Sequence, residues 1–268
     1  MVSRLRLRLP LLGLLVALLL GGHHSAQAAT FIGLSQTRSV AIGGQLSLED
    51  FETGEIFTAS QSFNEHTSPG DLGLFDRSVG LGSLLLDTPL GSGQGSGRAA
   101  QTSQLGSERI VFDGTADVFM SGQVHSFNAA MTGSGGAASR LSYRFALAQD
   151  IAVLLDAASE LGPRGNAYTF SLTRDNGEVV WDQTSIIDGD GNEQRVFTTH
   201  VVLTAGVYNL ETALTATSFF SGNFGFAGRA LARFSITPVP LTNPLVLLAS
   251  AGTLIAGLGR RRRSTLAR

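Results

Sequence analysis

The sequence predicts an all-β protein, an antiparallel β-sandwich or jelly-roll-like fold, flanked by an N-terminal signal peptide and a C-terminal transmembrane helix. Two observations predict the β class. Short apolar runs alternate with polar or small residues, and 33 glycines together with many Ser and Thr residues supply frequent turns. Between the two ends of the chain the sequence contains no long helical period.

The clearest strand is predicted at 141–147, where every second residue is apolar. Residues 168–172 alternate in the same way and lead through Asn176-Gly177, a strong hairpin signal, into 179–181. Tyr143, Tyr168 and Tyr208 fall at such alternating positions. The sequence therefore predicts that these three tyrosines pack in the core, rather than forming an exposed sugar-binding face.

Two further strand pairs are predicted from turn residues between apolar runs. Residues 110–112 and 116–120 form a hairpin around Asp113-Gly114, and 195–203 pairs with 207–214.

In three further segments the alternation of apolar residues predicts the secondary structure less clearly. Residues 231–236 give a last strand, and 151–161 fits either a strand or a short helix. The Phe-Gly segment 219–226 is predicted to be a core strand pair around a turn, with an exposed apolar patch as the alternative.

The N-terminal part carries weaker signals. Residues 39–48 and 56–63 are predicted strands, and 91–97 is a Gly/Ser-rich low-complexity stretch. We divide the exported part into a β or irregular segment with a Gly/Ser-rich linker, 29–98, and a β-sandwich, 99–237. The linker is expected to lie within one β unit, because 29–98 has few strong strands for a core of its own.

The first 28 residues have the pattern of a signal peptide. Arg4, Arg6 and Arg8 precede an apolar stretch, 9–20, that is short for a bilayer span. Ala26-Gln27-Ala28 follows as a small-x-small cleavage site. Export and cleavage by signal peptidase are expected, with an uncleaved anchor as the alternative.

Composition excludes several function classes. The chain has no Cys and no Lys, which removes thiolate chemistry, Schiff-base catalysis and the phosphate-loop lysine. Residues 29–237 hold 11 arginines and 21 acidic residues, which gives a net charge of −10. Such a surface repels nucleic acid, so no nucleic-acid partner is expected.

One acidic segment has spacing suited to a metal. Asp188, Asp190 and Asn192 occupy positions 1, 3 and 5 of a calcium-type loop. Glu193 and Thr199 then stand where such a loop needs glycine and a bidentate glutamate, and a polar turn explains the same residues. Calcium is the only cofactor with a candidate site, and this site is weak.

No catalytic motif accompanies it. His66, His125 and His200 are far apart in the chain, and no serine lies in a Gly-x-Ser-x-Gly elbow. The protein is therefore expected not to be an enzyme. A carboxylate pair from distant strands, as in glycoside hydrolases, is a pattern that sequence does not reveal.

The C-terminal segment is predicted to be a transmembrane helix. Residues 241–259 are uncharged and long enough to cross a bilayer core as a helix, about 28 Å. The cluster Arg260, Arg261, Arg262 and Arg263 follows at once and places the C-terminus in the cytoplasm. The exported protein is thus expected to be held at the inner membrane.

Just before this helix stand Pro238, Val239 and Pro240, so that 238–263 joins a proline motif, an apolar helix and an arginine cluster. This layout resembles the sorting signal of PEP-CTERM proteins of Gram-negative bacteria, with Pro-Val-Pro in the place of Pro-Glu-Pro. Val239-Pro240-Leu241 is similar to the family's Val-Pro-Leu-Pro-Ala variant, with Thr242 in place of the second proline. The resemblance implies processing by an exosortase and a final location at the cell surface or in an exopolysaccharide matrix.

The sequence thus predicts an exported, exosortase-sorted β-sandwich without enzymatic activity, associated with the cell surface or with biofilm exopolysaccharide. Two alternatives stay open. One is a secreted polysaccharide-active enzyme, and the other is a periplasmic protein that keeps its membrane anchor.

Overall fold

The computed structural model describes residues 30–67, 70–163, 165–187 and 191–239. Within these residues the protein is all-β and contains twelve strands. The strands are β1 (Ile32–Asp50), β2 (Ile56–His66), β3 (Phe75–Thr88), β4 (Gly91–Leu105), β5 (Ile110–Val124), β6 (Ala129–Leu147), β7 (Ile151–Leu161), β8 (Asn166–Arg174), β9 (Val179–Ile187), β10 (Glu193–Leu203), β11 (Gly206–Ser221) and β12 (Gly225–Pro238). The predicted signal peptide and C-terminal helix lie outside the described residues.

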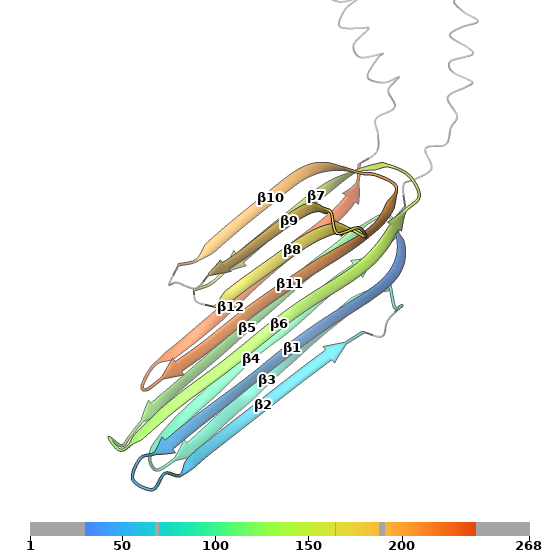
Figure 1. Ribbon diagram of the computed structural model, residues 1–268. Coiled ribbons are helices and arrows are strands. Elements are labelled where there is room, and N and C mark those ends of the chain that lie inside the picture. The colour runs from blue at the N-terminus through green and yellow to red at the C-terminus, as the bar shows by residue number, and fades with distance from the viewer. Residues whose placement is uncertain (1–29, 68–69, 164, 188–190, 240–268) are drawn as a thin grey trace, which may run out of the picture.

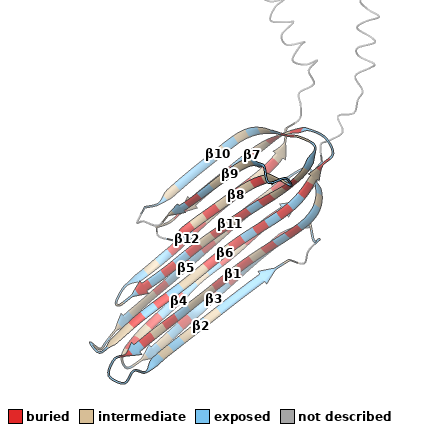
Figure 2. Cartoon of the chain, viewed as in Figure 1, coloured by how far each residue is buried: buried red, intermediate tan, exposed pale blue. Residues whose placement is uncertain are grey.

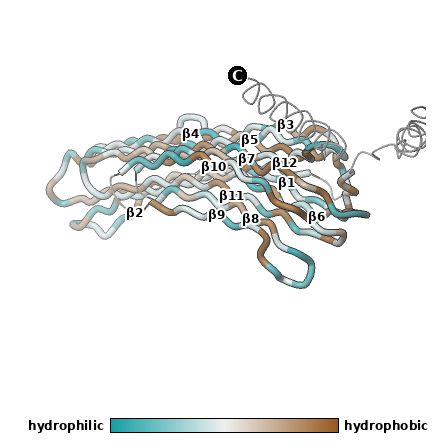
Figure 3. The backbone as a smooth tube through the Cα atoms, turned by 90° about the horizontal axis from the view of Figure 1, so that it is seen from above, coloured by the Kyte–Doolittle hydropathy of each residue, from teal (hydrophilic) through white to brown (hydrophobic). Residues whose placement is uncertain are grey.

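The strands form two antiparallel sheets of six strands each, stacked face to face (Figures 1 and 3). Sheet A has the order β2-β1-β6-β11-β8-β9, and sheet B the order β10-β7-β12-β5-β4-β3. This arrangement confirms the prediction of an antiparallel β-sandwich. No helix in the described part of the chain is long and apolar enough to span a membrane.

Side-chain alternation explains why these sequences form a sandwich. Along β11 the residues Tyr208, Leu210, Leu214 and Phe220 face the other sheet and are buried, while their neighbours face solvent. The same alternation marks the other long strands, as the banding in Figure 2 shows. Each sheet therefore contributes one apolar face to a single core between the layers.

Aromatic side chains occupy two regions of this core. Tyr143, Phe145 and Tyr208 stack with ring centroids 5.5 and 5.6 Å apart, and all three are 1% exposed or less. Phe234 stacks on Phe170 at 5.3 Å and on Trp181 at 5.6 Å. Tyr168 is also buried, so the core placement predicted for the three tyrosines is confirmed.

A buried arginine lies beside the first aromatic region. The Arg38 side chain on β1 is fully buried and donates hydrogen bonds to the carbonyl oxygens of Asp71, Gly73 and Ser103 and to Gln36 Oε1. Its guanidinium lies 5.3 Å from the Phe75 ring centroid. Loss of hydration on burial lowers the pKa of Arg38, and the charge of Asp71 opposes this shift. Arg38 thereby ties the β2–β3 connection to the core.

The predicted hairpin at 110–120 is wrong. Residues 110–124 form the single strand β5, and Gly114 lies in its interior. A Cβ at Gly114 would lie 2.7 Å from the ring of Phe112 and 3.0 Å from Ser139 Oγ. The glycine thus leaves room in the core, and it does not form a turn.

The predicted linker at 91–97 is also wrong, because these residues begin strand β4 in sheet B. Gly93 and Gly95 face the core, where a Cβ would lie 2.4 Å from Met131 Cε and from Met120 Sδ, respectively. The long methionine side chains fill the space that these glycines leave free. Strands β1 and β2 of the same N-terminal segment pair within sheet A, and both predicted strands are confirmed.

The predicted pairing of 195–203 with 207–214 is wrong as well. These segments are strands β10 and β11, which lie in different sheets. β10 pairs with β7, and β11 pairs with β6 and β8. The ambiguous segment 151–161 is strand β7, and the predicted hairpin around Gly177, which has a φ of 85°, is confirmed as β8–β9.

The chain also changes sheet between β11 and β12. Gly222 turns the chain with a φ of 84°, and Ser218 Oγ donates a hydrogen bond to the Phe226 carbonyl. A Cβ at Gly228 would lie 2.1 Å from the Thr217 carbonyl oxygen. The two backbones therefore approach closely only because residue 228 is glycine.

The Phe-rich segment 219–226 is divided between core and surface. Phe220 is buried, whereas Phe219 and Phe224 are more than half exposed, and Phe219 stacks on Phe226 at 5.9 Å. The core prediction thus holds for Phe220, and Phe226 is partly buried against the core, whereas Phe219 and Phe224 lie at the surface. The strands on either side belong to different sheets, so they do not form the predicted strand pair.

Four turns gather at the end of the sandwich away from the two described chain ends (Figure 1). Phe51 N–H donates to the Asn128 carbonyl at 2.7 Å, and His125 N–H donates to the Leu90 carbonyl at 2.8 Å. Val124 N–H donates to Asn223 Oδ1 at 2.6 Å. We call this group of hydrogen-bonded turns, residues 51–55, 89–90, 125–128 and 222–224, the distal end.

Asp50 stabilises the first distal turn and makes it sensitive to pH. Hydrogen bonds from Glu52 N–H at 2.9 Å and Thr53 Oγ1 at 2.8 Å lower the pKa of the Asp50 carboxyl. A carboxyl whose folded pKa is lowered contributes stability above its unfolded pKa of about 3.9 and loses it as the pH falls through the folded value.

We expect Asp50→Asn to lower the melting temperature at pH 7 and to approach the wild type in strong acid. Thermal unfolding followed by circular dichroism between pH 7 and pH 2 measures this convergence. Ser126→Ala, in a neighbouring distal turn, removes a hydrogen bond to Asn128 N–H without removing a charge. Its deficit is expected to stay constant, and a constant deficit for Asp50→Asn would contradict the assignment.

Candidate functional site

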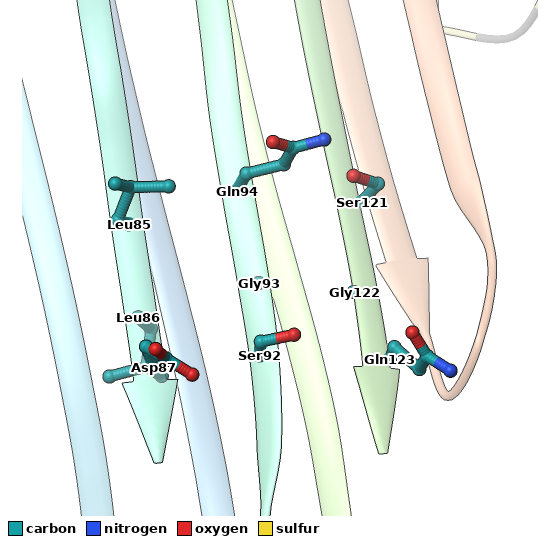
Figure 4. A pocket seen from close by; sticks show the side chains of 9 residues that line it. All are labelled: Leu85, Leu86, Asp87, Ser92, Gly93, Gln94, Ser121, Gly122 and Gln123. Atoms are coloured by element: carbon teal, nitrogen blue, oxygen red, sulfur yellow. The ribbon is translucent and has the colours of Figure 1, made fainter. Parts of the chain in front are cut away.

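The candidate site is a groove on the outer face of sheet B, close to the distal end. It has a volume of about 510 Å³ and crosses β3, β4 and β5 where these strands meet their distal turns (Figure 4). Its lining residues are Leu85, Leu86, Asp87, Ser92, Gly93, Gln94, Ser121, Gly122 and Gln123.

Strand register brings the polar lining residues into two rows. Leu85, Gln94 and Ser121 are neighbours across the three strands, and so are Asp87, Ser92 and Gln123. Cross-strand neighbours lie about 5 Å apart, so the side chains of each row are close enough to contact one ligand together. The rows offer two amides and two hydroxyls, which both donate and accept hydrogen bonds, and one carboxylate, which accepts them.

Apolar contact is available beside these rows. Leu85 is 61% exposed at one side of the groove, and Phe119, two residues before Ser121, is partly exposed on the same face of β5. Gly93 and Gly122 stand at the alternating core-facing positions. A Cβ at Gly122 would lie 2.3 Å from the Phe220 ring. These glycines leave room for the large core side chains of Met131 and Phe220 beneath the groove.

The turn below the groove is fixed by its own hydrogen bonds. Thr88 Oγ1 donates to the Gly91 carbonyl at 3.0 Å and accepts from the N–H groups of Leu90 and Gly91, both at 3.2 Å. His125 N–H, in the neighbouring turn, donates a hydrogen bond to the Leu90 carbonyl oxygen. The groove is therefore formed before any ligand binds, which lowers the entropic cost of binding.

The predicted metal residues are not brought into a site by the described structure. Asp188 and Asp190 lie outside the described residues, and Asn192 is exposed beside the start of β10. Among the residues that the structure describes, no three His, Asp or Glu side chains are grouped to hold a metal ion. The calcium site stays a prediction.

The three histidines lie in separate places. His66 ends β2, His125 lies in a distal turn and His200 lies in β10, and all three are exposed. The lining of the groove contains a single carboxylate, Asp87, within the described chain, whereas glycoside hydrolysis uses two.

Of the predicted sorting residues, the structure describes Pro238 and Val239. Pro238 is the last residue of β12 and pairs with Val153, and Val239 N–H donates to the Ala152 carbonyl at 2.8 Å. Pro240 and the arginines Arg260, Arg261, Arg262 and Arg263 lie outside the described residues. The proline motif thus begins where sheet B ends.

Two other hollows are less suited to a ligand. One, of about 640 Å³, lies on the outer face of sheet A over small residues such as Ala41, Gly43 and Gly136. The other, of about 380 Å³, lies on sheet B beside Asp113 and Glu160. Asp113 is already held by Arg233, with Nε 2.9 Å from Oδ2.

The fold and groove define the protein's class as a two-layer antiparallel β-sandwich with a polar groove on one outer face. No family model and no curated protein matches the chain.

Several solved structures are weakly similar. A CBM4 structure shares 10% identity at a TM-score of 0.23, covering 46% of this chain and 71% of that one. An arabinose-bound α-L-arabinofuranosidase, MgGH51, shares 13% identity at 0.20, covering 47% of this chain and 22% of that one. A structure of the infectious bursal disease virus Gx strain shares 11% at 0.24, covering 80% and 59%. At these scores the similarity assigns no function.

Proposed function

We propose that this protein is an exported, exosortase-sorted binding protein of the bacterial surface, and that the groove on sheet B binds a neutral polysaccharide. The observation that carries the binding proposal is the double row of side chains across β3, β4 and β5, which offers amide, hydroxyl and carboxylate groups beside the exposed Leu85.

Charge favours a neutral ligand over an acidic one. The exported residues carry a net charge of −10, and the only ionisable group among the described lining residues is the acidic Asp87. An anionic polymer would be repelled by both. A neutral sugar has hydroxyl groups for the amides and the carboxylate, and C–H faces for Leu85.

Removing both groove amides tests this proposal. We expect Gln94→Ala/Gln123→Ala to weaken binding to neutral polysaccharides by about 10-fold or more, since two hydrogen bonds at about 1 kcal/mol each are lost. Affinity electrophoresis through gels that contain dextran, a soluble β-glucan or alginate measures the change.

Gln104→Ala is the matched control, because Gln104 is an exposed glutamine on the same strand, far from the groove. Binding only to the acidic alginate, or equal binding by all three proteins, would refute the groove as a neutral-sugar site.

The sorting proposal is supported by the order of segments around the described C-terminus. The last strand ends at Pro238, the first residue of the proline motif, and the apolar stretch 241–259 and the arginines follow directly. A folded domain that ends at the motif leaves the tail beyond it for recognition by an exosortase.

Intact-mass measurement of the protein in its native host tests sorting separately from binding. We expect a released or surface form that has lost residues 1–28 and the arginine cluster, and a cell-bound precursor that keeps the cluster. A released form that still carries Arg260, Arg261, Arg262 and Arg263 would contradict processing, as would a membrane-bound form alone.

A further inference from the structure

The two sheets end on one side of the molecule in strands β9 and β10 (Figure 1). β10 pairs along its whole length with β7, without a register shift. No described strand lies on the other side of β10. Alternate N–H and C=O groups of this strand are therefore free to pair with another chain.

This edge exposes several branched apolar side chains. Val179 and Ile186 on β9 and Val196 and Val202 on β10 are each at least 61% exposed. Behind them Trp181, Phe197 and Val201 are only partly buried against the core. β10 contains no proline and pairs with β7 without a bulge, and its charged residues, Glu193 and Arg195, lie near one end of the strand.

The opposite edge of the sandwich differs. There β2 exposes polar side chains such as Ser60 and Ser62 together with the apolar Ile56 and Phe63. Glu65 Oε2 of β2 lies 3.5 Å from Arg77 Nε of β3. This ion pair links the two sheets. This ion pair, rather than a lack of exposed apolar side chains, distinguishes that edge from the one formed by β9 and β10.

We propose that β10 is a self-association strand, through which two copies of the chain pair antiparallel about a two-fold axis at Thr198. Thr198 is the centre of the strand Glu193–Leu203, so this register pairs the greatest number of residues. It also sets Glu193 against Leu203 and Arg195 against Val201 of the second copy. No two like charges then stand opposite each other.

Other registers are less favourable. An axis at Arg195 sets two arginines directly opposite, and an axis at His200 leaves the first four residues of the strand without partners. In the proposed register Val196 and Val202 lie on the same face as the corresponding valines of the second copy. Two six-stranded B sheets thereby join into one continuous sheet.

The absence of cysteine allows a direct test in the full chain. Opposed residues of an antiparallel pair have Cα atoms about 4.5 to 5.5 Å apart, within the range of a disulfide. We expect Thr198→Cys to form a covalent dimer on mild oxidation. Ser62→Cys, at an exposed position of the opposite edge, serves as the control and is expected to stay monomeric.

A second variant tests the interaction without relying on disulfide geometry. Val196→Lys places a charge on the edge, and its side chain is exposed, so folding is expected to be retained. By light scattering the wild-type chain is expected to have twice the protomer mass and Val196→Lys to be monomeric. Circular dichroism is expected to show the same β content in both, and only the wild type is expected to melt at a temperature that rises with protein concentration.

A monomeric wild type would overturn the proposal, as would equal cross-linking of Thr198→Cys and Ser62→Cys. A mixed disulfide of Thr198→Cys with another protein, in place of the dimer, would also overturn it and would indicate a different partner. The outcome does not depend on sugar binding, because the groove lies on β3, β4 and β5 at the other side of sheet B.

Discussion

Arg38→Met is expected to destabilise the fold by about 3 kcal/mol or more. The substitution removes the charged donor from the buried carbonyl oxygen of Ser103 and from the partly buried hydrogen bonds to the carbonyl oxygens of Asp71 and Gly73. Each buried polar group without a partner costs about 1 to 3 kcal/mol. Methionine replaces part of the packing against Phe75 and supplies no hydrogen bond, so the loss of polar contacts dominates.

Urea denaturation followed by circular dichroism measures this effect. Arg98→Met is the matched control, since Arg98 is exposed on β4, and its free energy of unfolding is expected to change by less than about 0.5 kcal/mol. Limited proteolysis gives a second readout, because release of the β2–β3 connection should expose residues 70–74 to cleavage before global unfolding. Equal stability of the two variants would contradict the role assigned to Arg38.

Phe234→Ala is expected to cost about 3 to 5 kcal/mol, the range for deletion of a buried phenylalanine ring. Phe234 on β12 is 1% exposed and stacks between sheets on Phe170 and Trp181. Its removal leaves a cavity at the point where the aromatic side chains of sheet A meet sheet B.

Trp181 is the only tryptophan of the chain, so its fluorescence reports on this cluster directly. We expect a red shift of the native emission maximum in Phe234→Ala, together with the lower free energy of unfolding. Phe127→Ala, at a fully exposed phenylalanine of a distal turn, is expected to change neither quantity. A native emission maximum unchanged in Phe234→Ala would show that the stacked ring does not shield Trp181.

The local sequence pattern was sufficient to predict a strand and its turn where both depend on adjacent residues. Alternation predicted β6 and β8, and Asn176-Gly177 predicted the β8–β9 hairpin because Gly177 needs the left-handed backbone that this turn requires. Asp113-Gly114 is a similar turn signal, but the hairpin predicted from it is wrong. Gly114 is required by the space that Phe112 of the same strand and Ser139 of the opposite sheet occupy, and the contact with Ser139 exists only once the two sheets pack.

The same limit explains the error at β10 and β11. A short turn at Gly206 joins two strands whether they pair as a hairpin or enter different sheets. Only the partners, β7 for one strand and β6 and β8 for the other, decide between these outcomes. Such long-range pairing leaves no mark in the residues of the turn.

The groove was not predicted, for a related reason. Asp87, Gln94 and Ser121 stand at solvent-facing positions of three different strands, where almost any polar residue is accepted. Their common row exists only once the register is known. The available signal is the Gly-x-Gly spacing of 91–97, which fits a strand packed over large core side chains as well as it fits the linker predicted from composition.

The position of β12 has a mechanical consequence. This strand is hydrogen-bonded on both sides, to β5 and β7, and it ends at Pro238 next to the described C-terminus. A pull on that end directed along the strands would load the bonds on both sides in shear, so many must break together before the strand slides. Strands such as β6, with 19 residues, extend about 60 Å along the same axis. Tension between the distal groove and the C-terminus would therefore act along the direction in which the sandwich resists extension most strongly. Unfolding of the domain under such a force would be governed by its rate constant of unfolding.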